Sequence, residues 1–256
     1  LTLAGADAAL FTLSGTTLSL KSAPDYEVKA SYTISITATD AGNKSYSESF
    51  TISVGDVNDA PVLAAPVSMA ITEDASSSAV SGALSATDPE GATLSYQLVN
   101  GTLASGSYTL TGTYGTLVLN GATGSYTYTL NNSAQATNAL AGGASANETF
   151  AVRVSDGSST TASQNLVINI TGANDAPVIS SGRTATVAEN TATSTVLYAP
   201  DVSDVDTGDT KTYALSGPDA SYFNINATTG AVTLKSAANY EVKASYQFIV
   251  SVTDSA

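Results

Sequence analysis

The 256-residue sequence contains no cysteine, no histidine and no tryptophan. Without cysteine the chain has no disulfide, no zinc–thiolate site and no thiol nucleophile, although this absence does not identify a compartment. Without histidine it lacks the commonest general base and the usual ligand of transition metals. The donors that remain for a metal are the oxygens of Asp, Glu, Asn and backbone carbonyls, and such donors suit calcium.

Basic residues are also scarce. Eight Lys and Arg face 22 Asp and Glu, so the formal net charge is -14. A chain this acidic repels nucleic acid and anionic membrane surfaces and attracts cations. No apolar run approaches the roughly 20 residues of a membrane helix, and no signal-peptide pattern opens the chain. We therefore expect no nucleic-acid partner and no membrane insertion in this segment, and we interpret it as an internal piece of a longer chain.

Motifs of common enzyme classes are missing as well. The sequence has no GxSxG, no Walker loop and no HExxH. Two carboxylates can serve a glycosidase, but here the acidic residues recur in repeated turns and do not gather in one segment. We predict that the protein is not an enzyme.

Strand-forming residues are abundant. Apolar and polar residues alternate over residues 32–38 and 50–54, and Gly, Pro and Asn punctuate such runs along the chain. Further strands are predicted at 186–187, 196–198 and 246–252. The Ala-, Asn-, Gly- and Ser-rich residues 131–146 are expected to form a loop, with a short helix around residues 134–140 as the alternative. This pattern predicts an all-β fold made of β-sandwiches.

The chain also repeats itself. Residues 21–32 return almost unchanged as residues 235–246, and the tetrapeptide Asn-Asp-Ala-Pro ends at both Pro61 and Pro177. Repeats this close indicate a tandem array. We predict three repeats: 1–59, the C-terminal part of one repeat; 60–175, a complete repeat; and 176–256, a repeat without its last strand.

Oxygen donors recur in a fixed order around the two Asn-Asp-Ala-Pro joints. An acidic residue follows the first strand, then come an Asp-rich turn, a Tyr-Glu pair, an Asp at a strand end, and the joint itself. The candidate metal ligands are Asp25, Glu27, Asp40, Asp56, Asn58, Asp59, Glu73, Asp88, Asp156, Asn174, Asp175, Glu189, Asp204, Asp206, Glu241 and Asp254.

Calcium is the cation that this pattern favours. Two like charges about 4 Å apart repel by roughly 4 kcal/mol at an effective dielectric near 20, and a divalent ion reverses the sign of that interaction. A single Asp or Asn in a β protein is more often a turn former. The Ala-Pro step also holds a linker extended with or without a metal. The repeated order of the whole set favours the metal interpretation.

The order of these motifs resembles that of bacterial cadherin-like tandem repeats. The middle repeat resembles the VCBS repeat of large RTX-type adhesins, through residues 71–82, 86–96, 148–157 and 174–177. The resemblance implies immunoglobulin-like, cadherin-like Greek-key β-sandwiches with calcium at the joints between them.

The resemblance also implies how each joint is supplied. Asp25 and Glu27 above and Asp88 and Asp156 below would serve the first joint, and Glu73 above and Asp204, Asp206 and Asp254 below would serve the second. Asp40, Glu189 and Glu241 would serve other joints. There are departures: the second joint has no acid at the Asp56 position, Asp88 is followed by proline with no second Asp, and Glu148 does not replace the missing Tyr-Glu pair. We expect two unequal joints with one or two ions each.

The function implied is a structural extender of a secreted or cell-surface bacterial adhesin, stiffened by calcium, that supports calcium-dependent cell adhesion and biofilm formation. Its expected partners are neighbouring repeats, like repeats on another cell, or a surface polysaccharide. The alternative is a carbohydrate-binding module that uses Tyr96, Tyr108, Tyr114, Tyr126 and Tyr128. Tyrosines that pack between strands are the plainer explanation for these residues.

Overall fold

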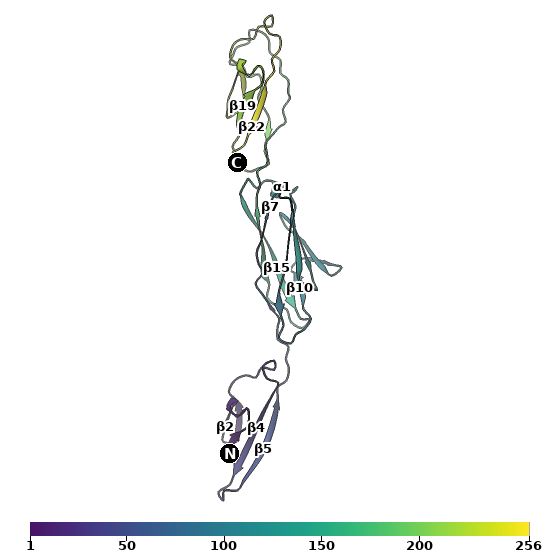
Figure 1. Ribbon diagram of the computed structural model, residues 1–256, viewed down its shortest axis with the longest axis vertical. Helices are drawn as coiled ribbons and strands as arrows, with labels where there is room; N and C mark the ends of the chain where they lie inside the picture. The colour runs from purple at the N-terminus through teal and green to yellow at the C-terminus, as the bar shows by residue number, and fades with distance from the viewer. Residues whose placement is uncertain (256) are drawn as a thin grey trace. The chain divides into compact units, whose positions relative to one another are not determined.

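The computed structural model describes residues 1–255 and is almost entirely β, as the sequence predicts (Figure 1). It divides into two compact units, one made of residues 1–64, 85–96 and 153–162 and the other of the remaining residues. The division passes through the middle predicted repeat, so the three-repeat boundaries stay a prediction. None of the described helices is long and apolar enough to span a membrane.

The first unit contains a sheet in which β4 lies between β1 and β5. The inward face of β4 carries Tyr32 and Ile34, which are 7% and 1% exposed, and the ring of Phe11 meets Tyr32 edge-on at 5.5 Å. The strand predicted over residues 32–38 therefore forms, but its burial alternates only at residues 31–34; residues 35–37 are all half-buried and Ala38 is exposed. The elements of this unit are β1 (Thr2–Ala4), the 3₁₀ turn η1 (Ala8–Leu10), β2 (Phe11–Ser14), β3 (Thr17–Leu20), β4 (Ser31–Thr39), β5 (Ser45–Ser53), β6 (Val62–Leu63) and β9 (Ala86–Thr87).

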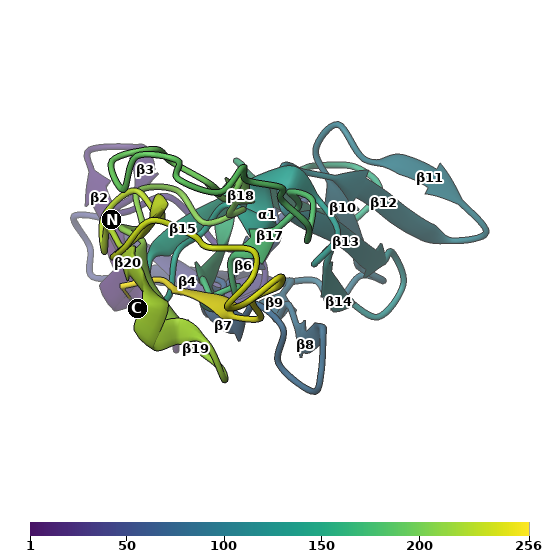
Figure 2. The same ribbon diagram turned by 90° about the horizontal axis from the view of Figure 1, so that it is seen from above.

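The largest core lies between two sheets. One has the strand order β11-β12-β13-β14-β8, which Figure 2 shows, and the other has the order β10-β15-β16-β7. The rings of Tyr128 from the first sheet and Phe150 from the second are 5.9 Å apart, so the sheets form the two layers of a sandwich. The strands are β7 (Met69–Thr72), β8 (Ala79–Ala83), β10 (Ser95–Leu98), β11 (Thr102–Ala104), β12 (Ser107–Thr111), β13 (Gly115–Asn120), β14 (Ser125–Leu130), β15 (Ser145–Ser155) and β16 (Gln164–Thr171).

The C-terminal part of the second unit has a small core of its own around Phe223, Val232 and Leu234. β19 pairs with β22, β20 with β21, and β17 with β18, all antiparallel. The elements are β17 (Val178–Ile179), β18 (Val202–Ser203), β19 (Thr212–Ser216), the 3₁₀ turn η2 (Ala220–Tyr222), β20 (Phe223–Ile225), β21 (Val232–Leu234) and β22 (Ile249–Thr253).

The repeated sequence at the two ends builds the same local structure twice. In each copy an aspartate before a 3₁₀ turn forms an ion pair with a lysine and accepts a backbone N–H farther along the chain. The pairs are Asp7 with Lys29 at 2.8 Å and Asp219 with Lys243 at 3.0 Å. The repeat in the sequence is therefore also a repeat in the structure.

Some predicted elements are wrong. Residues 186–187 and 246–248 are not in strands, and Tyr198 makes only an isolated bridge with Val232. Among the described residues β22 pairs with β19 alone. Gln247 exchanges hydrogen bonds with Asp219, as Thr33 does with Asp7, but no described strand pairs with residues 246–248 as β5 pairs with β4. Residues 131–144 form the expected connection and include the short helix α1 (Gln135–Asn138), which lies where the alternative placed a helix, whereas residues 145–146 already belong to β15.

Candidate metal centres at the two joints

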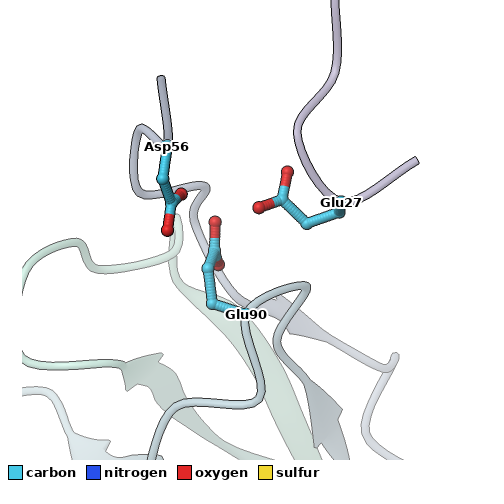
Figure 3. A group of neighbouring side chains, drawn as sticks. All are labelled: Glu27, Asp56 and Glu90. Carbon is cyan, nitrogen blue, oxygen red and sulfur yellow. The ribbon is translucent and has the colours of Figure 1, made fainter. Parts of the chain in front are cut away.

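The first joint brings three carboxylates together. One oxygen from each of Glu27, Asp56 and Glu90 lies within 4.8 Å of the others, and Figure 3 shows the three side chains directed toward a common space. We call these residues the first joint cluster. All three are exposed. Glu27 precedes β4, Asp56 lies in the linker after β5, and Glu90 lies in the turn after β9, so the cluster combines three separate segments.

Local hydrogen bonds place these side chains. The Asp25 carboxylate accepts the backbone N–H of Val28 at 2.9 Å, which closes the turn that carries Glu27. The backbone N–H of Asp59 donates to Glu90 Oε1 at 2.8 Å. The linker itself therefore holds Glu90 beside Asp56.

Mutual repulsion acts on this cluster. A hydrogen bond from its own backbone N–H lowers the pKa of Glu27, but desolvation and the charges of Glu90, Asp56 and Asp25 outweigh it and raise the pKa above its ordinary value. A carboxylate whose acidic neighbours raise its pKa is in an environment that a bound cation relieves.

The second joint collects more acidic residues and buries them more deeply. We call Glu73, Asp175, Asp204, Asp206 and Asp209 the second joint cluster. Glu73 is 2% exposed and Asp206 is 5% exposed. Among the described residues, only the first joint cluster meets the 4.8 Å spacing. The carboxylates of the second joint cluster are less tightly grouped, but acidic neighbours contribute to raised pKa values of Glu73, Asp175 and Asp209.

Burial and repulsion raise several pKa values in the second joint cluster. Desolvation raises the pKa of Glu73, against a hydrogen bond from the backbone N–H of Ala173, and the charges of Asp175 and Asp206 add to the rise. Desolvation and acidic neighbours likewise raise the pKa of Asp175 and of Asp209. The acidic residues of the second joint cluster therefore oppose one another's ionisation.

Buried carboxylate oxygens without hydrogen-bond donors mark both joints. They are Asp88 Oδ2 at the first joint and Glu73 Oε1, Asp204 Oδ2, Asp206 Oδ1 and Asp209 Oδ2 at the second. A buried charged acceptor without a partner is costly. Calcium takes six to eight oxygen ligands in flexible geometry, so this donor set is of the kind that fits calcium.

The asparagine side chain of each linker makes the same kind of contact at both joints. Asn58 Nδ2 donates to Asp156 Oδ2 at 2.9 Å, and Asn174 Nδ2 donates to Asp254 Oδ2 at 3.2 Å. Sequence reasoning assigned both aspartates to the joints, and the structure places both beside the linker. In this structure each contacts the linker through the amide of its asparagine.

The residue after each of these asparagines also makes an equivalent contact. The Asp175 N–H donates to Asp206 Oδ2 at 2.7 Å, as the Asp59 N–H does to Glu90. Glu90 was not among the candidate ligands. The signal was present, because Glu90 follows Asp88 by two positions as Asp206 follows Asp204, with Glu in place of Asp. Asp209 was also missed, and its sequence carries no comparable signal.

The structure explains why the second joint has no counterpart of Asp56. The equivalent residue is Gly172, and a Cβ there would lie 2.2 Å from the backbone oxygen of Leu140 and 2.6 Å from that of Ala141. The chain after α1 therefore leaves no space for a side chain. The buried Glu73, whose Oε2 accepts the N–H next to Gly172, supplies a carboxylate at this place instead.

Other predicted ligands lie outside the two clusters. Asp40 Oδ1 accepts the N–H groups of Gly42 and Lys44 and so shapes the β4–β5 hairpin. Glu189 and Glu241 are exposed and belong to neither cluster. Their assignment to further joints stays a prediction.

The tyrosines proposed for sugar binding are largely inside the sandwich. Tyr96, Tyr126 and Tyr128 are buried, and Tyr108 and Tyr114 are half-buried. A sugar platform requires rings that are exposed on one face, so the structure does not favour the carbohydrate-binding alternative.

The raised pKa values predict how the calcium-free chain responds to pH. Glu73, Asp175 and Asp209 hold their protons to higher pH when folded than when unfolded. Their ionisation therefore lowers the free energy of unfolding as the pH rises above the ordinary values of 3.8 and 4.5. We expect the urea midpoint in calcium-free buffer to fall as the pH rises from about 4.5 to 7.

At lower pH the free energy of unfolding changes in the opposite direction. Hydrogen bonds and lysine partners lower the pKa of Asp7, Asp156 and Asp219, and the stability that they contribute is lost only as the pH falls below about 3.8. The control is Asp175→Asn, which should flatten the fall above pH 4.5. A midpoint that rises steadily to pH 7 in calcium-free buffer would contradict the prediction.

Comparison with known proteins agrees with this architecture. Residues 58–172 match the family model of the bacterial cadherin-like domain. No curated protein sequence matches the chain. The crystal structure of mouse cadherin-23 EC22–24 aligns with 94% of this chain and 76% of its own, at 18% identity and a TM-score of 0.60.

Two further structures give the same result. Protocadherin gamma B2 EC1–5 aligns with 98% of this chain, which spans 50% of that structure, at 16% identity and a TM-score of 0.63. Human CDH23 EC21–23 aligns with 92% of this chain and 74% of its own, at 20% identity and a TM-score of 0.55. At these identities the likeness shows the fold. This chain therefore has the fold of cadherin repeats, and its middle segment matches the bacterial cadherin-like domain.

Proposed function

We propose that this chain is an extender segment of a secreted or cell-surface bacterial adhesin, in which calcium binds at the two joints and stiffens the array of repeats. One observation carries the proposal. Both linkers are held by equivalent hydrogen bonds next to carboxylate clusters, and these joints contain buried oxygens that accept no hydrogen bond. The match to a bacterial cadherin-like domain supports the adhesin context.

Calcium would act on the linkers directly. Each linker ends in Ala-Pro, which keeps the chain extended, and an ion bound by the cluster would tie that linker to the turns that carry the other ligands. The first joint cluster and the second joint cluster differ in burial and in the number of acids. We therefore propose one or two ions per joint with unequal affinities.

The expected partners follow from this role. Neighbouring repeats of the same chain are the first, and like repeats on another cell are the second, as expected of an adhesion-type array. The VCBS-like and RTX-type setting and a part in biofilms belong to the same proposal.

Calorimetric titration of the chain with calcium tests the proposal. We expect the wild type to bind calcium, and Asp206→Asn to weaken the second joint at least tenfold, because affinity at such sites depends on the number of charged ligands. Asn keeps an oxygen for the Asp175 N–H, so the linker contact is preserved.

The matched control is Asp40→Asn, which removes an exposed carboxylate from a hairpin turn outside both clusters. It should bind calcium as the wild type does. A wild type that takes up no calcium at millimolar concentration would refute the proposal, and retention on a glycan panel without calcium would favour the carbohydrate-binding alternative.

A further inference from the structure

A lysine lies against the second joint cluster. Lys211 Nζ is 3.4 Å from Asp204 Oδ2, and the side chains are 24% and 1% exposed, respectively. The contact is an ion pair without a hydrogen bond, because Asp204 Oδ2 has no hydrogen-bond partner. The lysine charge also acts on Asp209, where it opposes the repulsion from the neighbouring acids. Lys211 is therefore a positive charge placed among carboxylates that otherwise repel one another.

The first joint has no equivalent of this lysine. Gly91 corresponds to Gly208 and Tyr96 to Tyr213 in the two Asp-rich turns, and this alignment places Leu94 opposite Lys211. The two joints thus share the linker contacts but differ in this one charge.

The second joint cluster also contains buried carboxylate oxygens that have no hydrogen-bond donor. Glu73 and Asp206 are both more than nine-tenths buried, and each has a carboxylate oxygen that accepts no hydrogen bond. Lys211 pairs with Asp204, so neither of these two oxygens takes the ammonium group as a partner. These oxygens of Glu73 and Asp206 therefore remain available to a second cation.

We propose that Lys211 is an internal counter-ion of the second joint cluster that competes with calcium. Its ammonium group offsets part of the carboxylate repulsion when calcium is absent, and calcium binding weakens its pairing with Asp204. The proposal rests on the proposed function and concerns its regulation. Coupling between two cations at one cluster is reciprocal, so if calcium weakens the lysine pair, the lysine weakens calcium binding by the same factor.

The consequence is a difference between the joints. The second joint stays partly neutralised without calcium and binds the ion less tightly than its carboxylates alone would. The first joint cluster, which has no such lysine, depends on calcium for its neutralisation. The two joints then stiffen at different calcium concentrations.

The test removes the charge and keeps the length of the side chain. Lys211→Met is titrated with calcium in a background of Asp56→Asn and Glu90→Gln, which disables the first joint cluster, so that the heat reports the second joint. We expect calcium affinity to rise about fivefold and the melting temperature in calcium-free buffer to fall. The affinity difference should shrink as potassium chloride increases from 50 to 500 mM, because salt screens the lysine charge.

Two further variants separate this role from a merely structural one. Lys211→Arg keeps the charge and should restore wild-type affinity. Lys243→Met removes a lysine of the same repeat that pairs with Asp219 at 3.0 Å away from the cluster. It should lower the melting temperature equally with and without calcium and leave the affinity unchanged.

The results distinguish failure of the counter-ion proposal from failure of the proposed function. Unchanged calcium affinity in Lys211→Met, with equal loss of stability in both conditions, would overturn this proposal and leave the proposed function standing. If the second joint binds no calcium in any variant, including the background that keeps Lys211, the counter-ion proposal is overturned. If the wild type also binds no calcium, the proposed function is overturned as well.

Discussion

Calcium at about 100 times its dissociation constant is expected to stabilise the folded chain by about 2.7 kcal/mol for each independent site. For a chain of this size, 1 kcal/mol corresponds to roughly 2–4 °C in melting temperature, so each occupied joint should raise the midpoint by roughly 5–10 °C. The physical reason lies in the carboxylates of the two joints. Buried oxygens of Glu73 and Asp206 lack donors, and desolvation together with neighbouring charges raises the pKa of Glu27 and Asp175.

Thermal unfolding in millimolar calcium, in excess chelator and in magnesium measures this effect. Magnesium should give a smaller shift, because it demands near-octahedral geometry and gives up its waters reluctantly. Small-angle scattering under the same conditions should show a more flexible particle in chelator. Superimposable melting and scattering curves in calcium and chelator would contradict the prediction.

Replacement of Glu148 by leucine is expected to destabilise the middle sandwich by about 4 kcal/mol. Glu148 is a buried acid away from both joints. It accepts the backbone N–H groups of Thr113 and Tyr114 and the hydroxyl of Tyr128, the last at 2.7 Å. Leucine would leave all three donors without this acceptor; the Tyr128 hydroxyl is buried, and the hydrogen bonds of the two N–H groups are partly buried.

Urea unfolding of Glu148→Leu, Glu148→Gln and Tyr128→Phe resolves the contributions. Glutamine keeps one acceptor oxygen and should cost less than leucine, and Tyr128→Phe should cost about 1 kcal/mol because it removes one hydrogen bond. Burial and the hydrogen bond to Glu148 raise the pKa of Tyr128, in accord with a donor held in place. Calcium affinity should be the same in Glu148→Gln as in the wild type. A loss below 1 kcal/mol in Glu148→Leu would show that water replaces the carboxylate.

Much of the architecture was readable from the sequence. Alternation over residues 32–38 predicted β4, and the recurring Asn-Asp-Ala-Pro marks two segments that make equivalent backbone contacts. These signals are local: alternation reports one buried face of a sheet, and a tandem repeat must build the same contacts twice. The two joints differ in burial, and the unequal calcium binding expected from Asp56 and its missing counterpart stays a prediction.

The candidate sites were only partly readable, because a cluster depends on which turns the fold brings together. Glu90 joins Glu27 and Asp56 through a backbone contact that spacing alone does not show. Gly172 excludes an acid from the second joint because a distant segment occupies the space. Lys211 meets Asp204 only after the turn folds.

The tetrapeptide Lys-Ala-Ser-Tyr separates what the sequence determined from what tertiary structure decided. It occurs at residues 29–32 and again at residues 243–246, and both copies predict the start of a strand. In the first copy β4 begins at Ser31, and Tyr32 pairs with Ile52 of β5; in the second, regular pairing starts only at Ile249. The sequence determined the strand-forming pattern and the repeat. Tertiary structure decided where the strand exists, because an extended backbone needs a neighbouring strand to take up its N–H and C=O groups.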